Sequence, residues 1–297
     1  MTSGTRTITA GIDGSRASLD AADWAAREAG RRGLPLRLLH AESAPAMPAR
    51  IPDVDVPVGR TRSALDRAAI QLSYAHPALD IIARSTETPA VPALLAAAAE
   101  TQTLVLGSRG STGCAGFPVG SVALGVAARA QRPVVLVRAG ELPEDERMPT
   151  GDGTPPSTAP YLPVVLGLDL DHPADDLIRY AFDTAAVRSA PLHVVHTWTL
   201  PPHHGHAPGS PVPEGTAERE DGKRQVLTGT VQPWRRKFPE TPVSERVFHG
   251  HPGHHLLKAS TGAGLLVTGR RTSERLGRSA RWLVHHAGCP VAVVPHA

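Results

Sequence analysis

The strongest constraint on the fold is an internal duplication, because two long segments of the chain align without a gap at an offset of 156 residues. Residues Ile8–Ala41 match residues Val164–Thr197, and the segment Arg132–Arg138 resembles Cys289–Pro295 near the end of the chain. This period is too long for a solenoid repeat, which spans about 20–50 residues. The sequence therefore predicts two copies of one domain, which fits a length of 297 residues.

A polar segment separates the two copies. Residues 139–160 are rich in Pro, Gly, Thr and acidic residues and contain almost no apolar side chains. Such a composition cannot support a core and is typical of an exposed linker. We therefore expect a first domain in residues 1–140, a linker in residues 141–160 and a second domain in residues 161–297.

Within each copy, short apolar runs alternate with helical patterns. Residues Ile8–Ile12 and Leu36–Ala41 have the character of buried parallel strands, and residues Ala17–Arg32 have helical spacing that ends at Gly33. The alternation continues with helices at about 61–76, 89–100 and 120–130 and strands at about 79–85, 103–107 and 133–138. Strands alternating with helices favour a parallel sheet covered on both faces. The predicted fold is α/β, with two Rossmann-like domains in tandem.

Composition argues against several partners. The net charge is only +3, no basic run exceeds two or three residues, and aromatic residues do not interleave with basic ones, so no stripe for nucleic acid is visible. No apolar run approaches the ~20 residues of a membrane span, and the N-terminal segment has no signal-peptide pattern. Two cysteines do not form a disulfide framework. We expect a cytoplasmic protein with neither a nucleic-acid nor a membrane partner.

The most specific motif is a glycine-rich segment after the predicted fourth strand of the first half. Ligands of open α/β sheets bind beyond the carboxyl ends of the strands. In the first half, Asp13 follows the first predicted strand, Ala41 ends the second, and the glycine-rich segment follows Leu106 of the fourth. That segment contains Gly107-x2-Gly110-x9-Gly120-Ser121. Glycines let backbone N–H groups approach a phosphate, and a helix N-terminus favours anions.

Two residues could add to such a site. Arg109 would supply a cation, and Ser121 would either cap the following helix or donate its hydroxyl to a phosphate oxygen. The same residues can equally form a simple glycine-rich turn in which Ser121 is only the N-cap. Glycine spacing alone leaves both interpretations open.

The combination of Asp13 with Gly107, Gly110, Gly120 and Ser121 resembles the nucleotide-binding pattern of the universal stress protein family. The stretches HPGHHLLKAS and HHAGCPVAVVP of the second half are also similar to that family. The whole chain, apart from the linker and the variable loops, resembles a tandem member. The resemblance implies strand order 3-2-1-4-5 in each adenine nucleotide alpha hydrolase-like domain, and binding of ATP or a related adenine nucleotide.

The resemblance also implies a role for each part of the site. The aspartate would meet the adenine or ribose, the end of the second strand would offer backbone contacts to the base, and the glycine loop would hold the phosphates. Magnesium could bridge those phosphates, held mainly by the nucleotide and water. Carried onto this sequence, the binding residues are Gly11, Ile12, Asp13, Ala41, Leu106, Gly107, Arg109, Gly110, Gly120, Ser121 and Val122.

The second half departs from the pattern. Asp169 is present, but Thr272 replaces the middle glycine and Arg278 follows the closing Gly277. The loop is five residues shorter, and the segment GRRTSERLGRSAR contains five arginines. A shorter loop cannot wrap a triphosphate in the same way. We therefore expect one nucleotide site per chain, in the first half.

Catalytic and metal-binding motifs are weak. The sequence has no P-loop, no G-x-S-x-G elbow, no H-E-x-x-H motif and no general base beside the glycine loop, so we expect no catalytic residue and no enzyme activity. A metal site is suggested by two groups of histidines, residues 203, 204 and 206 and those between 249 and 255. Firm ligand spacing is missing, so we expect no metal site. We expect His251-Pro252-Gly253 to form a turn ahead of a helix instead. Cys114 is either a redox-sensing thiol or an ordinary loop residue, and we expect Cys289 to be buried and inert.

Three functions remain open. The leading hypothesis is a non-catalytic, ATP-binding regulator of stress response or dormancy, with a possible protein partner in stress signalling. The alternatives are an interaction module that has lost its ligand and a slow ATPase. We expect the halves to pack as an intramolecular pseudo-dimer, with residues 133–138 and 290–294 near the interface, and leave a further homodimer open.

Overall fold

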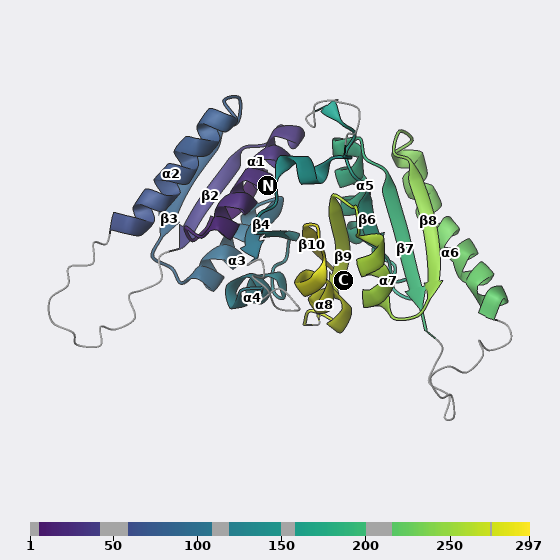
Figure 1. The fold of residues 1–297 in the computed structure, drawn as a ribbon. Coiled ribbons are helices and arrows are strands. Elements are labelled where there is room, and N and C mark those ends of the chain that lie inside the picture. The colour runs from purple at the N-terminus through teal and green to yellow at the C-terminus, as the bar shows by residue number, and fades with distance from the viewer. Residues whose placement is uncertain (1–5, 42–58, 109–118, 150–157, 200–215, 274) are drawn as a thin grey trace, which may run out of the picture.

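The strands of both halves join into one ten-stranded sheet in the order β3-β2-β1-β4-β5-β10-β9-β6-β7-β8 (Figure 1). The computed structural model describes residues 6–41, 59–108, 119–149, 158–199, 216–273 and 275–297. The first half contains β1 (Ile8–Ile12), α1 (Arg16–Arg32), β2 (Leu36–Ala41), α2 (Gly59–Ala75), β3 (Ile81–Thr86), α3 (Ala90–Glu100), β4 (Thr103–Ser108), α4 (Ser121–Ala127) and β5 (Val134–Arg138). The second half contains β6 (Val164–Gly167), α5 (Asp175–Arg188), β7 (Leu192–Trp198), α6 (Thr216–Lys237), β8 (Val243–His249), α7 (Pro252–Ala259), β9 (Leu265–Arg271), α8 (Arg278–His286) and β10 (Val291–His296).

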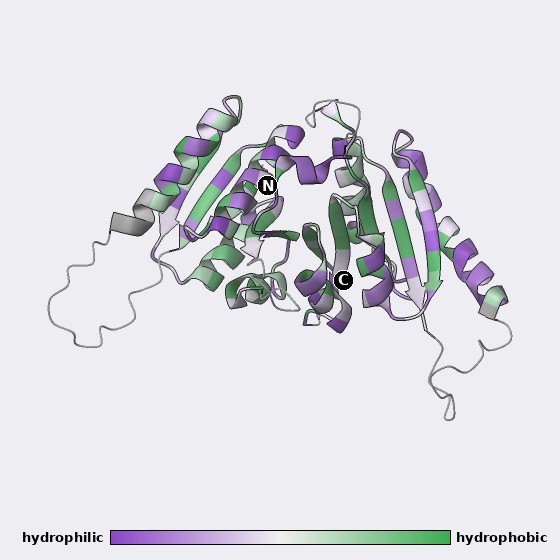
Figure 2. Ribbon diagram, in the orientation of Figure 1, coloured by the Kyte–Doolittle hydropathy of each residue, from purple (hydrophilic) through white to green (hydrophobic). Residues whose placement is uncertain are grey.

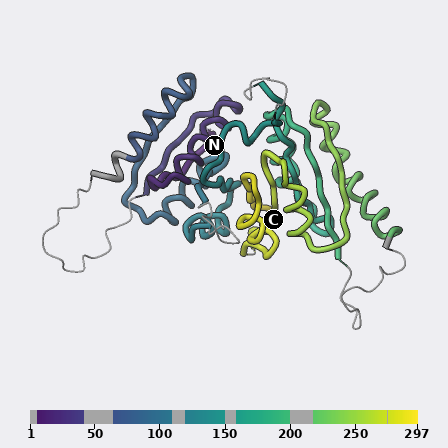
Figure 3. Tube along the Cα trace, viewed as in Figure 1, coloured from purple at the N-terminus to yellow at the C-terminus, as the bar shows by residue number. Residues whose placement is uncertain are grey.

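The two halves meet through their last strands. Within each half the neighbouring strands are parallel, and the order is third, second, first, fourth, fifth. β5 and β10 pair antiparallel, with Leu136 opposite Val291 and Val134 opposite Val293. Figure 3 follows the chain through the teal connection into the second half, whose yellow end returns to the centre. The predicted α/β class is confirmed, and the two fifth strands lie at the junction as expected.

Alternation along the strands creates two apolar cores, one on each face of the sheet. Ile8, Ala10 and Ile12 pack under α1 and α2, and the same core continues below α5 and α6. Leu104 and Leu106 face the other way, against α3 and α4, in the core that α7 and α8 also cover. Figure 2 shows that hydrophobic residues predominate in the central strands, whereas hydrophilic residues are frequent in helices such as α6. Among the described helices, none is long and apolar enough to cross a membrane.

Helix ends follow from local chemistry. Ser15 caps α1 by accepting a hydrogen bond from the Ser18 N–H, and Gly33 ends the helix in the left-handed conformation (φ 61°). The N-cap of α4 is Gly120, which makes no side-chain capping bond. The interpretation of Ser121 as an N-cap is therefore wrong, because Ser121 is already the first helical residue.

The connection between the halves is not a fully exposed linker. A short 3₁₀ helix, η1 (Pro143–Glu146), ends in Glu146, whose side chain is completely buried and forms ion pairs with Arg27 and Arg31 of α1. Arg147 lies over the Tyr161 ring at 4.0 Å, and these two residues also form an isolated antiparallel bridge. The prediction of an exposed linker is wrong for Glu146, because a charged side chain can be buried when opposite charges meet it.

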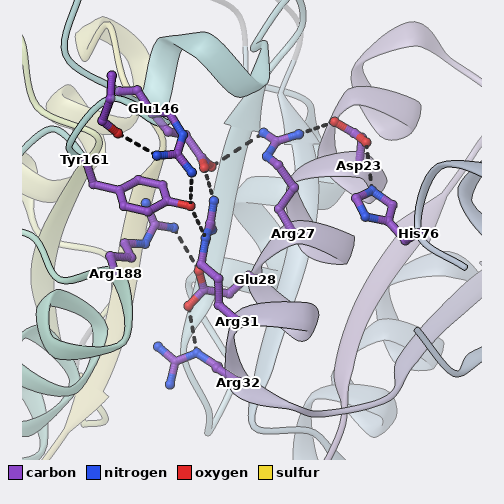
Figure 4. A network of polar contacts seen from close by, with 11 residues as sticks. Asp23, Arg27, Glu28, Arg31, Arg32, His76, Glu146, Tyr161 and Arg188 are labelled. Carbon is purple, nitrogen blue, oxygen red and sulfur yellow. Dashed lines mark hydrogen bonds and ion pairs between the residues drawn. The ribbon is translucent and has the colours of Figure 1, made fainter. Parts of the chain in front are cut away.

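A buried ionic network joins α1 to α5 (Figure 4). The Glu28 carboxylate accepts hydrogen bonds from Arg32 (2.6 Å), Arg31 (3.1 Å) and, from the second half, Arg188 (2.9 Å). Glu28 and Arg188 are each 2% exposed. Arg32 also pairs with Asp183 of α5 and donates to the Thr184 hydroxyl at 3.0 Å. The network therefore links the two halves on the face of the sheet opposite to the face that α4 and α8 cover.

This network predicts an acid-sensitive component of stability. Burial alone would raise the pKa of Glu28, but Arg188, Arg32 and Arg31 outweigh burial and lower the pKa from 4.5 to about 2. A carboxyl with a lowered folded-state pKa stabilises the fold above its unfolded pKa and loses that contribution as pH falls. We expect the free-energy difference between wild type and Glu28→Gln in urea unfolding to shrink by on the order of 3 kcal/mol from pH 5 to pH 2. A difference that does not change over this range would contradict the assignment.

Candidate functional site

The candidate site lies at the carboxyl edge of the first half, where the strand order reverses. β1 pairs with β2 on one side and with β4 on the other, so Gly11 and Ile12 lie between the ends of these two strands. Ala41 ends β2, and Leu106 and Gly107 lie near the end of β4. Asp13 follows β1 directly. The structure thus brings six of the predicted residues to one sheet edge: Gly11, Ile12, Asp13, Ala41, Leu106 and Gly107.

Asp13 is held in a tight turn at the start of α1. Its Oδ1 accepts a hydrogen bond from the Ser15 N–H at 2.9 Å, and its own N–H donates to the Ser18 hydroxyl at 3.3 Å. The residue is exposed. The turn therefore orients a carboxylate at the edge of the sheet where solvent or a ligand can reach it.

Of the predicted glycines, Gly107 is required for packing, and Gly11 is closely approached by a side chain. A Cβ on Gly107 would lie 2.5 Å from the backbone carbon and oxygen of Ala17, and a Cβ on Gly11 would lie 2.7 Å from Leu106 Cδ2. Because backbone cannot move aside as a flexible side chain can, Gly107 fixes the close approach of α1 to β4. Asp13 depends on the same first turn of α1, through Ser18. Sequence spacing did not indicate this packing role.

Gly120 is different. Its backbone is extended (φ −58°, ψ 147°), a conformation open to any residue, and no described atom lies within 4 Å of a Cβ added there. Neither the backbone nor packing among the described residues therefore demands glycine at this position. Ser121 and Val122, the first residues of α4, are exposed. Arg109 and Gly110 lie outside the described residues.

His40 is a residue whose role at this edge the sequence did not indicate. Its ring is 4% exposed, and Nδ1 lies 2.6 Å from the carbonyl oxygen of Ile12, which immediately precedes Asp13. His196 makes the equivalent contact with Leu168 at 3.0 Å. The available signal was the alignment of His40 with His196 in the duplication. Each histidine ties the end of the first strand of its half to the second.

The equivalent edge of the second half carries its own cation. Asp169 lies 3.4 Å from His172 Nδ1 and 3.8 Å from Arg271 Nη2, and Arg271 and His172 are 2.9 Å apart. Arg271 ends β9, and in the alignment of the two halves it matches Arg109. Asp169 therefore has a guanidinium and an imidazole of its own chain within 4 Å.

The histidines and cysteines do not add a metal centre to the described part of the chain. Across the described ranges, no group of three or more His, Cys, Asp or Glu side chains is placed to hold a metal ion. His251 is the N-cap of α7, and Pro252 and Gly253 are already helical, so the prediction of a turn at His251-Pro252-Gly253 ahead of the helix is wrong. Cys289 is buried as expected, and burial raises the pKa of its thiol to about 12. His203, His204, His206 and Cys114 lie outside the described residues.

Comparisons with known proteins agree with this architecture. The model of the Universal stress protein family matches residues 4–138 and 160–295. A universal stress protein of Mycolicibacterium smegmatis is 28% identical over 97% of this chain and 96% of its own length, and one of Mycobacterium tuberculosis is 29% identical over 89% and 86%. The crystal structure of a universal stress protein from Archaeoglobus fulgidus has a TM-score of 0.66 at 16% identity and covers 99% of both chains. This last likeness concerns the fold.

Proposed function

The chain belongs to the universal stress protein family, and from that premise we propose that its first half binds one adenine nucleotide, with ATP as the preferred ligand. Asp13 would meet the ribose or adenine, Ala41 and Ile12 would flank the base, and the segment from Gly107 to Ser121 would hold the phosphates. Magnesium would bridge phosphate oxygens, held by the nucleotide and water. We further propose that the protein acts as a non-catalytic regulator of stress response or dormancy.

Gly120 is the observation that carries the proposal. Gly120 lies at the entrance to α4 with open space around it among the described residues, and the absence of a side chain would let a phosphate approach the backbone there. Its companions Gly11 and Gly107 hold the surrounding strands and α1 in place. Asp13, exposed and oriented by α1, supplies a hydrogen-bond acceptor at the same edge.

Calorimetric titration of the full chain with ATP and magnesium tests the proposal. We expect one nucleotide per chain, because the second half lacks the intact glycine loop and surrounds Asp169 with Arg271 and His172. Ultraviolet absorbance of the purified protein should show that nucleotide co-purifies with it, at no more than one nucleotide per chain. Two equivalent sites would contradict the assignment to the first half. Absence of binding would favour the interaction module, and steady-state phosphate release would favour the slow ATPase.

A further inference from the structure

A cavity of about 640 Å³ lies at the junction of the two halves. The first half contributes the residues that follow β5, from Arg138 to Glu141, and Asp145 of η1. The second half contributes Leu162, the end of α7 with the turn after it, His286, and residues 288 and 289 before β10. Its volume is within the range of pockets that hold small organic molecules, about 300–1,000 Å³.

One acidic side chain in the wall of this cavity lacks a partner. Glu141 is 8% exposed. No hydrogen bond or ion pair joins its carboxyl to another described residue, although the charges of Arg27 and Arg138 act on it, and its backbone N–H donates to the Arg138 carbonyl oxygen. A buried carboxyl without a hydrogen-bond donor in direct contact costs free energy, unless a ligand supplies a donor or a positive charge. Glu141 is therefore one polar group of the cavity that is available to a ligand.

The rest of the wall favours a positively charged guest. Asp145 adds a second carboxylate, which accepts a hydrogen bond from the Leu142 N–H at 2.9 Å. Ser260 caps the C-terminus of α7, so the negative end of that helix faces the same space. The Arg138 guanidinium donates to the Ala287 carbonyl oxygen at 2.9 Å. Leu162, Leu257 and Ala263 supply apolar wall.

We propose that this interdomain cavity binds a small organic cation, a protonated primary amine with an apolar body, whose ammonium group pairs with Glu141. The ammonium would satisfy the unpartnered carboxylate, and the apolar body would cover the leucine and alanine side chains. Across the described residues no three metal-ligating side chains converge, which favours an organic cation over a metal ion. The proposal does not depend on the nucleotide site.

Titration of the full chain with benzylamine, cyclohexylamine and agmatine tests the proposal, with saturation-transfer NMR for detection and calorimetry for affinity. We expect at least one amine to bind with a dissociation constant below about 10 mM. Benzyl alcohol, the uncharged counterpart of benzylamine, should bind more weakly. Glu141→Gln keeps the shape but removes the charge, and should weaken amine binding about tenfold. Glu144→Gln, an exposed change in the same segment, should leave affinity unchanged.

A second variant fills the cavity without touching Glu141. No atom of the described residues lies within 4 Å of a Cβ on Gly288, which lines the cavity, so Gly288→Leu can be accommodated and should abolish amine binding. Gly222→Leu on the exposed surface of α6 is the matched control. The proposal is overturned if no amine binds, or if both Glu141→Gln and Gly288→Leu bind amines as wild type does. ATP affinity of Gly288→Leu should stay unchanged, so this result and failure of the nucleotide site are distinguishable.

The pH dependence gives a third readout. Burial, together with the charges of Asp145 and Glu146, raises the pKa of Glu141 to about 7, while Arg27 and Arg138 oppose this shift. Cys289, whose thiol pKa Glu141 helps to raise, and His286 also line the cavity. Since the amines stay protonated between pH 6 and 8, their affinity should increase across this range as Glu141 loses its proton. Equal affinities at pH 6 and pH 8 would contradict pairing with Glu141.

Discussion

Replacing Glu28 with alanine should lower the free energy of unfolding by about 3–5 kcal/mol, the largest stability effect we expect from a single substitution in this chain. Glu28 accepts hydrogen bonds from three arginines, and Arg188 among them is 2% exposed. Removal of the carboxylate leaves that buried guanidinium facing a cavity, without its counter-charge. The effect should appear in urea unfolding of the full chain at neutral pH.

The matched control is Glu100→Ala. Glu100 also pairs with an arginine, Arg37, at 2.9 Å, but its side chain is 70% exposed. An exposed pair contributes little, so this variant should change stability by less than about 1 kcal/mol. A Glu28→Ala variant as stable as Glu100→Ala would show that the network does not hold the two halves together. The double variant Glu28→Ala/Arg188→Ala should recover part of the loss, because it removes the orphaned charge.

Helices and strands were predictable from the sequence where one local pattern dominated, such as an apolar run or helical spacing of apolar residues. The apolar run at Leu36–Ala41 coincides with β2, and the helix expected from Ala17 to Arg32 differs from α1 by one residue. Gly33 ends α1 because it adopts the left-handed conformation that the C-cap requires. The carboxyl-edge position of Asp13 follows from the parallel topology alone.

Contacts between distant segments could not be derived in this way. Glu146 belongs to a polar segment by composition, and its burial depends on Arg31, which lies 115 positions earlier in the chain. The packing role of Gly107 likewise depends on the backbone of Ala17, which no local pattern reveals. Composition describes what a segment can do alone, whereas burial of a charge depends on which opposite charge the fold brings to it.

Replacing Gly120 with leucine should weaken ATP binding at least about 100-fold while leaving the melting temperature unchanged. A leucine side chain has room among the described residues, since no atom lies within 4 Å of a Cβ at this position. It would occupy the space in which phosphates approach the backbone at the start of α4. Calorimetry with ATP and thermal unfolding of the same sample separate the two effects.

Substitutions at two other glycines, Gly277 and Gly107, are the controls for the Gly120→Leu result. Gly277 is the N-cap of α8, also with extended backbone (φ −60°) and no atom within 4 Å of a Cβ, so Gly277→Leu should alter neither stability nor ATP affinity. Gly107→Ala should instead destabilise the fold by about 1–3 kcal/mol, because its Cβ would lie 2.5 Å from the Ala17 backbone. Unchanged ATP affinity in Gly120→Leu would remove the glycine loop from the binding site. Equal losses of affinity in Gly120→Leu and Gly277→Leu would contradict the assignment of the nucleotide to the first half alone, because Gly277 belongs to the second half.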